Sequence, residues 1–233
     1  MTASIAARQA VMLEFAALGA SSTCPLGMYV LPTRDDVFTH GACPAAWQCV
    51  LFIHRGYFRD SVLRFSMTMA STYPSRLPPT ITFSTNVFHP LVDPATGRFH
   101  FGDRFSPWTP GRDYLFHVLH HVKNAFKREG LDAVQQENCG NPEAWKMWVS
   151  ALQCRSLICP STYHDQTALF AKLASQTSAL SITPESLYTP SSSYANSIRF
   201  DPLRSISFRP LEEGEEEILT RRLEDEAKAK ISS

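Results

Sequence analysis

The sequence lacks the features that mark several classes of protein. Its charge is balanced, with 22 Lys and Arg against 22 Asp and Glu, which argues against broad electrostatic binding to nucleic acid. It has no run of about 18 apolar residues, so we expect no direct transmembrane insertion. Residues 1–20 carry Arg8 and Glu14 within an apolar stretch and lack the uninterrupted segment of a secretory signal. We therefore expect a cytoplasmic protein that does not bind nucleic acid.

The sequence also lacks a pattern typical of metal binding or of disulfide bonds. The six cysteines include no pair with CxxC spacing, so we expect free thiols rather than a zinc site or a disulfide framework. His117 and His121 have the spacing of neighbours on one helix face, but Val118 stands where a zincin has its general-base glutamate. We predict that these histidines are partly exposed helix residues and that the chain holds no cofactor.

Length and composition indicate one domain with an extension. The chain has 233 residues, against a prior of about 150 residues per domain, and its hydrophobic content of 44% is enough for a core. Residues 175–198 are rich in Ser, Thr and Pro, which predicts a flexible linker. We predict a domain over 1–155, a helical segment over 156–174, this linker, and a C-terminal extension over 199–233 with an amphipathic helix that runs from acidic to basic.

Hydrophobic spacing within the first domain predicts a helix, a run of strands and then further helices. Leu63, Phe65 and Met67 alternate with polar residues, as in a half-buried antiparallel strand. Residues 113–127 carry one apolar stripe, with Asp113 as the candidate N-cap. The predicted elements are helices over 6–18, 113–127, 141–153 and 165–173, and strands over 28–32, 47–54, 62–69 and 80–83.

Residues 86–111 form the candidate site region. They contain seven Pro and Gly residues, too many for a regular element of any length. We therefore expect a long loop, and loops carry a disproportionate share of functional residues.

Several motifs in this order resemble the ubiquitin-conjugating-enzyme fold over roughly residues 5–155. They are Tyr73-Pro74 with Pro78-Pro79, Val87-Phe88-His89-Pro90, Trp108 with Pro110, and the helix that begins at Asp113. The resemblance implies an α+β fold with an N-terminal helix, a four-stranded antiparallel meander and C-terminal helices.

The same resemblance implies that the catalytic groups are missing. Active members of the family have an asparagine directly after the His-Pro pair, and Leu91 stands there in this sequence. Their nucleophilic cysteine aligns with His100. A thioester needs a thiolate, which His100 does not supply, and the tetrahedral oxyanion needs a hydrogen-bond donor, which Leu91 does not supply. We therefore predict that the site at His89, Leu91 and His100 is degenerate and that the chain is not an enzyme, with His89 bonded to the loop backbone.

The loop also resembles a narrower group, the fused-toes (AKT-interacting protein) group of inactive ubiquitin-conjugating variants. The matching segments are 88–94 followed by Gly97, 141–144, and the Asp201-Pro202 region. This resemblance implies a scaffold that binds a Hook-family coiled-coil protein and a Hook-interacting protein. Such a complex links vesicles or endosomes to dynein for transport along microtubules.

Two apolar surfaces are candidates for partner binding. One is formed by Trp145, Trp148 and Leu152 on the helix over 141–153, and the other by Leu219 and Leu223 near the C-terminus. Each has a plain alternative, because the first can face the rest of the domain and the second can be a solvated helix. The aromatic cluster Phe99, Phe101, Phe105 and Trp108 likewise suits either a partner surface or the core.

Two other functions stay open from the sequence. The chain is alternatively an inactive variant that binds ubiquitin or pairs with an active conjugating enzyme. It is also alternatively a transferase that uses a different thiol, and Cys49 and Cys139 are the nearest in sequence to the loop.

Overall fold

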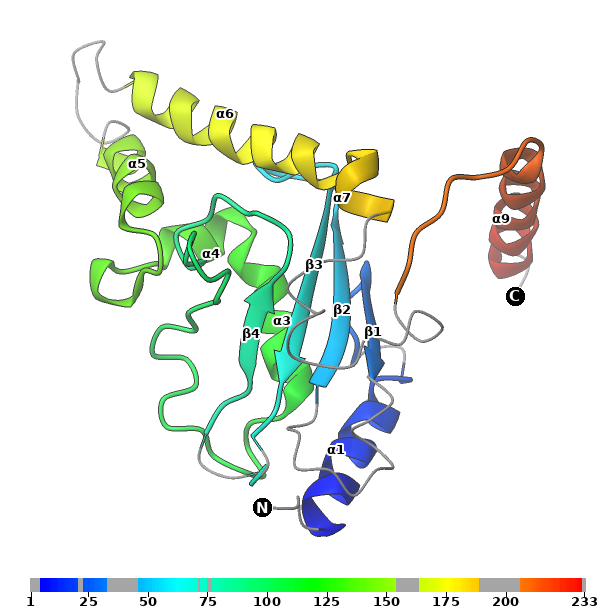
Figure 1. Cartoon of the computed structure of the whole chain (residues 1–233), viewed down its shortest axis with the longest axis horizontal. Helices are drawn as coiled ribbons and strands as arrows, with labels where there is room; N and C mark the ends of the chain where they lie inside the picture. Colours follow the sequence, from blue (N-terminus) through cyan, green and yellow to red (C-terminus); the bar gives the residue numbers. More distant parts are fainter. Residues whose placement is uncertain are drawn as a thin grey trace.

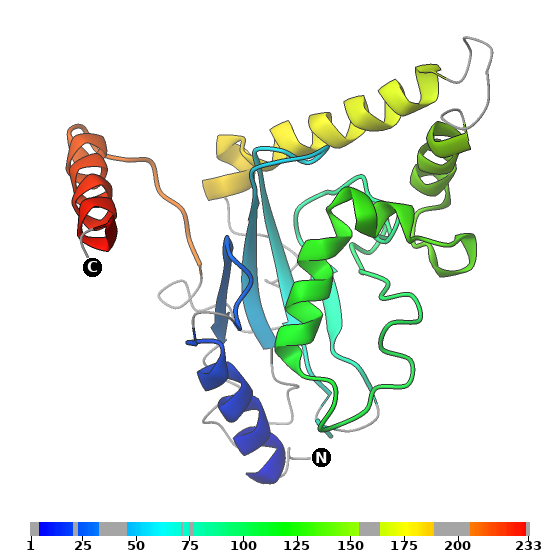
Figure 2. The ribbon, with the colours of Figure 1, turned by 180° about the vertical axis from the view of Figure 1, so that it is seen from behind.

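A computed structural model gives the fold of most of the chain. It describes residues 5–20, 23–32, 46–70, 72–74, 77–153, 164–188 and 206–231. Figures 1 and 2 show one sheet with a helix against one face and a long helix across one end.

The sheet is the antiparallel meander that the sequence predicts. Its strands are β1 (Met28–Pro32), β2 (Ala46–Ile53), β3 (Ser61–Thr68) and β4 (Thr80–Phe83), in the order β1-β2-β3-β4. Each strand pairs antiparallel with the next in the chain, so the sheet contains no crossover connection.

One face of the sheet forms the core, as the alternation on β3 predicts. Leu63, Phe65 and Met67 are buried, and their intervening neighbours are only half-buried. The helix α3 (Leu115–Ala125) lies against this face (Figure 2) and buries the predicted stripe. Burial removes the apolar side chains of both elements from water, which is the main force that holds helix and sheet together.

The N-terminal helix α1 (Ile5–Ala17) closes one end of this core. Its Phe15 ring meets the Trp47 ring edge-on, at a centroid distance of 5.5 Å. The Glu14 carboxylate accepts hydrogen bonds from the Tyr73 hydroxyl and from the Leu115 backbone N–H. Glu14 therefore satisfies a free N–H at the start of α3 from a different helix.

The prediction that Asp113 caps α3 is wrong. The N-cap is Tyr114, and the Asp113 carboxylate turns back to accept the Thr109 N–H at 2.8 Å. Asp113 also lies 3.6 Å from the Arg104 guanidinium. The carboxylate thus stabilises the preceding loop, while Glu14 bonds the helix end.

A short helix, a 3₁₀ turn and a longer helix follow α3. They are α4 (Arg128–Asp132), a 3₁₀ turn (Gln136–Asn138) and α5 (Pro142–Gln153). Asn141 caps α5 as predicted, because its side-chain oxygen accepts the Ala144 N–H at 3.1 Å.

The predicted linker over 175–198 is wrong as far as Tyr188. Residues 164–181 form one helix, α6 (His164–Ser181), and α7 (Pro184–Tyr188) follows it. The serines that predict disorder are used in docking, since the Ser181 hydroxyl accepts the Val62 N–H at 3.0 Å and donates to the Ser178 carbonyl. Small side chains let α6 lie close to β3. The rest of the predicted linker lies outside the described residues.

The extension ends in the predicted amphipathic helix. Residues 206–208 lie beside β2, where the Ile206 N–H bonds the Gln48 side chain at 3.2 Å and the Phe208 ring meets Phe52 at 6.3 Å. The helix α9 (Glu215–Ile231) then stands away from the sheet (Figures 1 and 2). In the parts of the chain that the structure describes, no helix has both the length and the apolar character for a membrane span.

Candidate functional site

The candidate loop over 86–111 runs along the free edge of β4. The Phe83 N–H donates to the Gly97 carbonyl at 2.8 Å, and the Phe99 N–H donates to the Ile81 carbonyl at 2.9 Å. Within the loop, Val92 and Phe99 form an isolated antiparallel bridge. Backbone hydrogen bonds therefore hold the loop to β4 and join two of its own segments. These bonds satisfy backbone polar groups that lie away from water.

His89 has the structural role that the sequence predicts. It is fully buried, its Nε2 lies 3.0 Å from the Ala125 carbonyl, and its Nδ1 accepts the Leu91 N–H at 3.0 Å. This pattern requires a neutral ring with the proton on Nε2. Burial lowers the pKa of His89 to about 4, which keeps the ring neutral at physiological pH.

The buried His89 predicts a loss of stability in mild acid. Its folded pKa of about 4 lies below the unfolded value near 6.5, so the folded state binds fewer protons and stability falls as the pH falls through this window. From pH 7 to pH 5 we expect a loss of about 2 kcal/mol from this residue. Urea unfolding measures the loss, with H89Q as the control that lacks this contribution. An NMR titration of the His89 ring with a midpoint near 6.5 would contradict the prediction.

Leu91 and His100 face each other across the loop through their backbones. The His100 N–H donates to the Leu91 carbonyl at 2.8 Å. The Leu91 side chain is buried, and His100 is exposed. Position 100 thus carries an exposed imidazole, and position 91, directly after the His-Pro pair, carries a buried hydrocarbon side chain.

These groups supply no thioester chemistry. Leucine has no donor for an oxyanion, and an acyl-imidazole hydrolyses too readily to act as a stable carrier. The segment from 86 to 111 contains no thiol.

The structure brings one thiol near the loop that is distant in sequence. The Gly140 and Asn141 N–H groups both donate to the Pro90 carbonyl, at 2.8 and 2.9 Å. Gly140 packs so closely that a Cβ there would lie 2.6 Å from the His100 ring. Its neighbour Cys139 is half-buried, with its thiol 3.0 Å from the Gln136 carbonyl.

The other two described thiols are poor nucleophiles. Burial raises the pKa of Cys49 well above its ordinary value, and its side chain is fully enclosed. Burial also raises the pKa of Cys24, and its thiol bonds the Met28 carbonyl. Of the two thiols that the sequence leaves as alternatives, only Cys139 lies close to the loop.

The aromatic cluster of the loop belongs to the core. Phe99, Phe105 and Trp108 are at most 2% exposed, and Phe101 is half-buried. The three phenylalanine rings lie around His121, whose ring centroid is 5.5 Å from that of Phe105, and the Trp108 ring packs on Phe105 at 5.6 Å. The cluster holds the loop against α3, and only Phe101 keeps part of its ring exposed.

The histidines of α3 form no metal site. Nε2 of His120 lies 3.0 Å from the Thr23 carbonyl, and Nδ1 of His117 accepts the Tyr114 N–H at 3.3 Å. Within the described residues, no group of three His, Cys, Asp or Glu side chains is suitably placed to hold a metal ion.

The surface predicted on α5 is largely covered by α6, which corrects the expectation for Trp148. Trp148 is 2% exposed, and its ring lies 5.1 Å from Phe170 and 5.2 Å from Tyr57. Trp145 is half-buried and donates its indole N–H to the Val134 carbonyl at 3.0 Å. The side chain of Leu152 lies outside the described residues. Trp145 is thus the one described tryptophan of this pair that retains exposed surface.

The surface predicted on α9 is open. Leu219 is 42% exposed and Leu223 is 67% exposed. Phe170 belongs to neither predicted surface, yet it is fully buried and its ring contacts join α6 to the domain. The local pattern does not single out this residue, because the predicted helix over 165–173 contains several apolar residues that fit a buried position equally well.

Comparisons with known proteins agree with this architecture. A family model described as ubiquitin-conjugating enzyme matches residues 24–151. The solved structure of S. cerevisiae Ubc12 is similar with a TM-score of 0.53 and 16% identity, over 72% of this chain and 74% of that one. At this identity the structural match supports the fold alone, and the predicted α+β conjugating-enzyme fold is confirmed.

Curated relatives confirm the narrower resemblance. A crossbronx homolog of Anopheles gambiae is 27% identical over 122 residues, which cover 52% of this chain and 50% of the relative. An AKTIP homolog of Nematostella vectensis is 30% identical over 122 residues (52% and 37%), and the AKT-interacting protein of Danio rerio is 31% identical over 100 residues (43% and 32%). The matched part of the chain spans half or less of the length of these relatives.

Proposed function

Because this chain belongs to the ubiquitin-conjugating enzyme family, we propose that it is a non-catalytic member that acts as a scaffold. In this proposal it is a subunit of a complex of a Hook-family coiled-coil protein and a Hook-interacting protein. The complex links vesicles or endosomes to dynein-driven transport along microtubules. The protein then works in the cytoplasm, at the surface of its cargo.

The observation that carries the proposal is the pair of residues at the predicted degenerate site. His100 occupies the exposed position expected for a thiolate, and the buried Leu91 replaces the side-chain amide. With no thiol in residues 86–111 and no side-chain amide at position 91, the fold retains its surfaces and lacks the two groups that acyl transfer in this family uses. The names of the curated relatives support the narrower assignment, since AKT-interacting protein describes binding and no catalytic activity.

The partner contact in this proposal uses the exposed leucines of α9 together with Trp145. A Hook coiled coil is an α-helical partner, and an apolar stripe on a helix is suited to pack against another helix. Binding of the full chain to a Hook C-terminal coiled coil, measured by pull-down and titration at physiological salt, tests this. We expect L219S/L223S to weaken binding at least about tenfold.

L180S is the matched control, because Leu180 is a 53% exposed leucine on a different helix, α6. It should bind as the unmodified chain does. Absence of any Hook binding by the unmodified chain would overturn the proposed partner.

The non-catalytic assignment has its own test. Incubation with activating enzyme, ATP and ubiquitin should leave the chain without a thiol-sensitive adduct on a nonreducing gel. An adduct that forms at an enzyme-like rate and disappears in C139S would show a displaced active site at Cys139 and overturn the assignment. Retention of free ubiquitin without an adduct would favour the ubiquitin-binding alternative over the scaffold.

A further inference from the structure

The C-terminal extension is attached to the sheet just before it turns into α9. The Ile206 N–H donates to the Gln48 side chain at 3.2 Å, and the Phe208 ring meets the Phe52 ring edge-on at 6.3 Å. The Phe52 ring also meets the Tyr29 ring of β1, at 5.7 Å. Phe208 thus extends an aromatic row that crosses two strands, and it is half-buried there. These contacts anchor the extension at Phe208.

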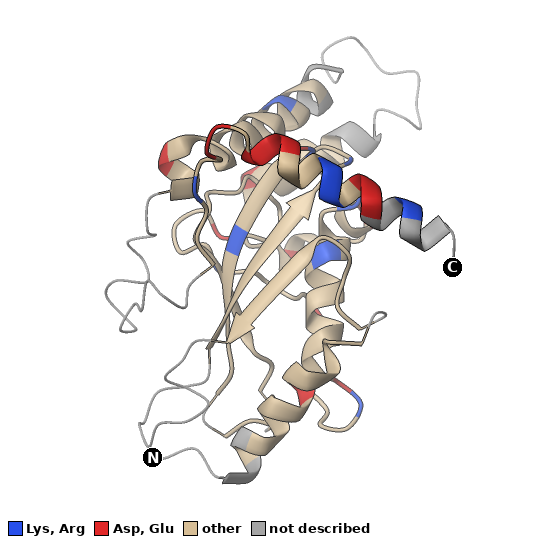
Figure 3. Cartoon of the chain, turned by 90° about the vertical axis from the view of Figure 1, so that its right-hand side faces the viewer, with Lys and Arg blue, Asp and Glu red and all other residues tan. Residues whose placement is uncertain are grey.

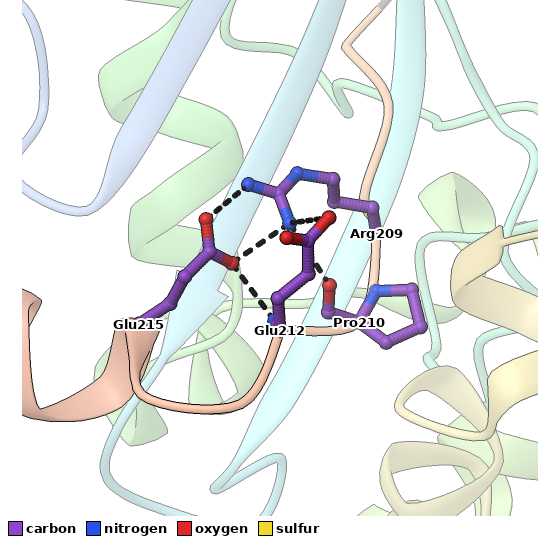
Figure 4. A network of polar contacts seen from close by, with 4 residues as sticks. All are labelled: Arg209, Pro210, Glu212 and Glu215. Atoms are coloured by element: carbon purple, nitrogen blue, oxygen red, sulfur yellow. Dashed lines mark hydrogen bonds and ion pairs between the residues drawn. The ribbon is translucent and has the colours of Figure 1, made fainter.

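Arg209, the next residue, connects this anchor to the first residue of α9 (Figure 4). Its guanidinium donates two hydrogen bonds to the Glu215 carboxylate, one to each oxygen, at 2.8 and 2.6 Å. Two bonds between two planar groups fix an angle as well as a distance. Because Phe208 and Arg209 are neighbours in the chain, these bonds relate the direction of α9 to the sheet.

The chain from Arg209 to Glu215 forms a closed turn, and we call residues 209–215 the elbow. The Glu212 N–H donates to the Glu215 carboxylate at 2.8 Å, and the Glu215 N–H donates to the Glu212 carbonyl at 3.0 Å. Gly214 has a φ of +86°, a left-handed conformation that glycine adopts without strain. The Glu215 side chain therefore closes the start of its own helix and receives Arg209 with the same carboxylate.

Acidic residues crowd this part of the chain. Residues 212–217 include five glutamates, and Figure 3 shows acidic residues in the turn that leads into α9 and at the start of the helix. Arg209 also lies 4.0 Å from the Glu212 carboxylate, so one cation contacts two acids. The hydrogen bonds from Arg209 lower the pKa of Glu215 to about 2, so this carboxylate is ionised at neutral pH. An isolated surface ion pair contributes little to stability, but a two-point contact within a charged network is an exception.

We propose that Arg209 is a positioning residue that fixes the direction of α9 relative to the sheet. The exposed Leu219 and Leu223 are then presented in one orientation, and a partner does not have to order the helix when it binds. Loss of Arg209 leaves the helix free to swing about the turn. The effect on partner binding rests on the proposed function, whereas the direction of α9 is a property of the chain alone.

Residual dipolar couplings of the backbone amides in the full chain test the direction of α9 with no partner present. The N–H bonds of an α-helix run nearly parallel to its axis, so couplings from a fixed helix fit the alignment tensor of the sheet and α3. A helix that swings averages its couplings toward zero. We expect R209A to reduce the couplings of α9 at least about threefold. R221A is the matched control, because it removes an exposed arginine of α9 outside the elbow, and it should leave the couplings unchanged.

R209K separates the two-point contact from simple charge attraction. Lysine keeps a positive charge beside the acidic turn, which favours the same start of the helix, but it lacks the fixed fork with which a guanidinium binds both oxygens. We expect R209K to lower the couplings of α9 nearly as much as R209A, while Cα chemical shifts show that the helix is kept. Couplings of the unmodified size in R209K would contradict the role of Arg209.

Titration with the Hook C-terminal coiled coil tests the consequence for binding. R209K should weaken binding at least about threefold, with Leu219 and Leu223 in place. Reduced couplings with unchanged affinity would overturn the positioning role. Unchanged couplings in both variants would show that α9 takes its direction from other contacts, whatever the partner does. Absence of Hook binding by the unmodified chain would overturn the proposed partner instead, and the couplings alone then decide whether Arg209 fixes the helix.

Discussion

Replacing Phe170 with alanine should lower the free energy of unfolding by about 3–5 kcal/mol, the usual cost of removing a fully buried phenylalanine. The Phe170 ring meets four others, at centroid distances of 5.1 Å for Trp148, 5.8 Å for Phe88, 5.9 Å for Tyr57 and 6.3 Å for Phe58. These rings come from α5 and from two loops. One substitution therefore removes the contact that joins α6 to the rest of the domain.

Urea unfolding monitored by fluorescence measures the effect of F170A, and limited proteolysis reports whether α6 is released. Leu169 is the matched control, since it is the preceding residue on the same helix and is 42% exposed. L169A should change stability by no more than about 0.5 kcal/mol. A loss below about 1 kcal/mol for F170A would show that α6 is not held by this ring.

The second large effect is expected at Gly97, where the loop returns to the edge of β4. Gly97 has a φ of +70°, and a Cβ at this position would lie 2.3 Å from the Phe83 carbonyl oxygen. The Gly97 carbonyl also accepts the Phe83 N–H, so the backbone cannot move away without breaking that hydrogen bond. We expect G97A to cost about 3 kcal/mol, from the left-handed backbone and the clash together.

A substitution at Gly56 separates the cost of the left-handed backbone from the cost of the Cβ clash. Its φ is +88°, but a Cβ there would meet no atom within 4 Å. G56A should therefore show only the backbone cost of about 1 kcal/mol. Equal losses in the two variants, measured by urea unfolding, would show that the contact between Gly97 and Phe83 is loose.

Much of the fold follows from local patterns. The alternation in β3 and the apolar stripe of α3 each identify a buried face, and the structure places both in the core. Turn residues and caps such as Asn141 mark the ends of elements because their hydrogen bonds are made within a few residues. These predictions succeed because each concerns one element and its own period.

The candidate site divides in the same way. The residues at positions 89, 91 and 100 are read directly from the motif, and the structure confirms that His89 bonds the backbone. That Cys139 lies beside the loop depends on the Gly140 contact with Pro90, a pairing about fifty residues apart in the chain. A motif search along the sequence has no means to find it.

The predictions that failed all concern which element covers another. Asp113 has the residue type of a cap, but Glu14 reaches the start of α3 from α1. The serines around 175–181 suit a linker, but they line a helix that docks on β3. Trp148 suits a partner surface, but Phe170 covers it.

The sequence by itself determined the strands and the core faces, because these depend on residue identity and local period, and its resemblance to the conjugating enzymes indicated that Leu91 and His100 stand where an amide and a thiol are expected. Only the tertiary structure decided which apolar faces are buried against other parts of the chain and which stay exposed, as Trp148 and Leu223 illustrate. The physical reason is that apolar burial is non-directional, so an apolar stripe specifies that a cover is needed without specifying which one. That choice is made by packing between elements far apart in the chain.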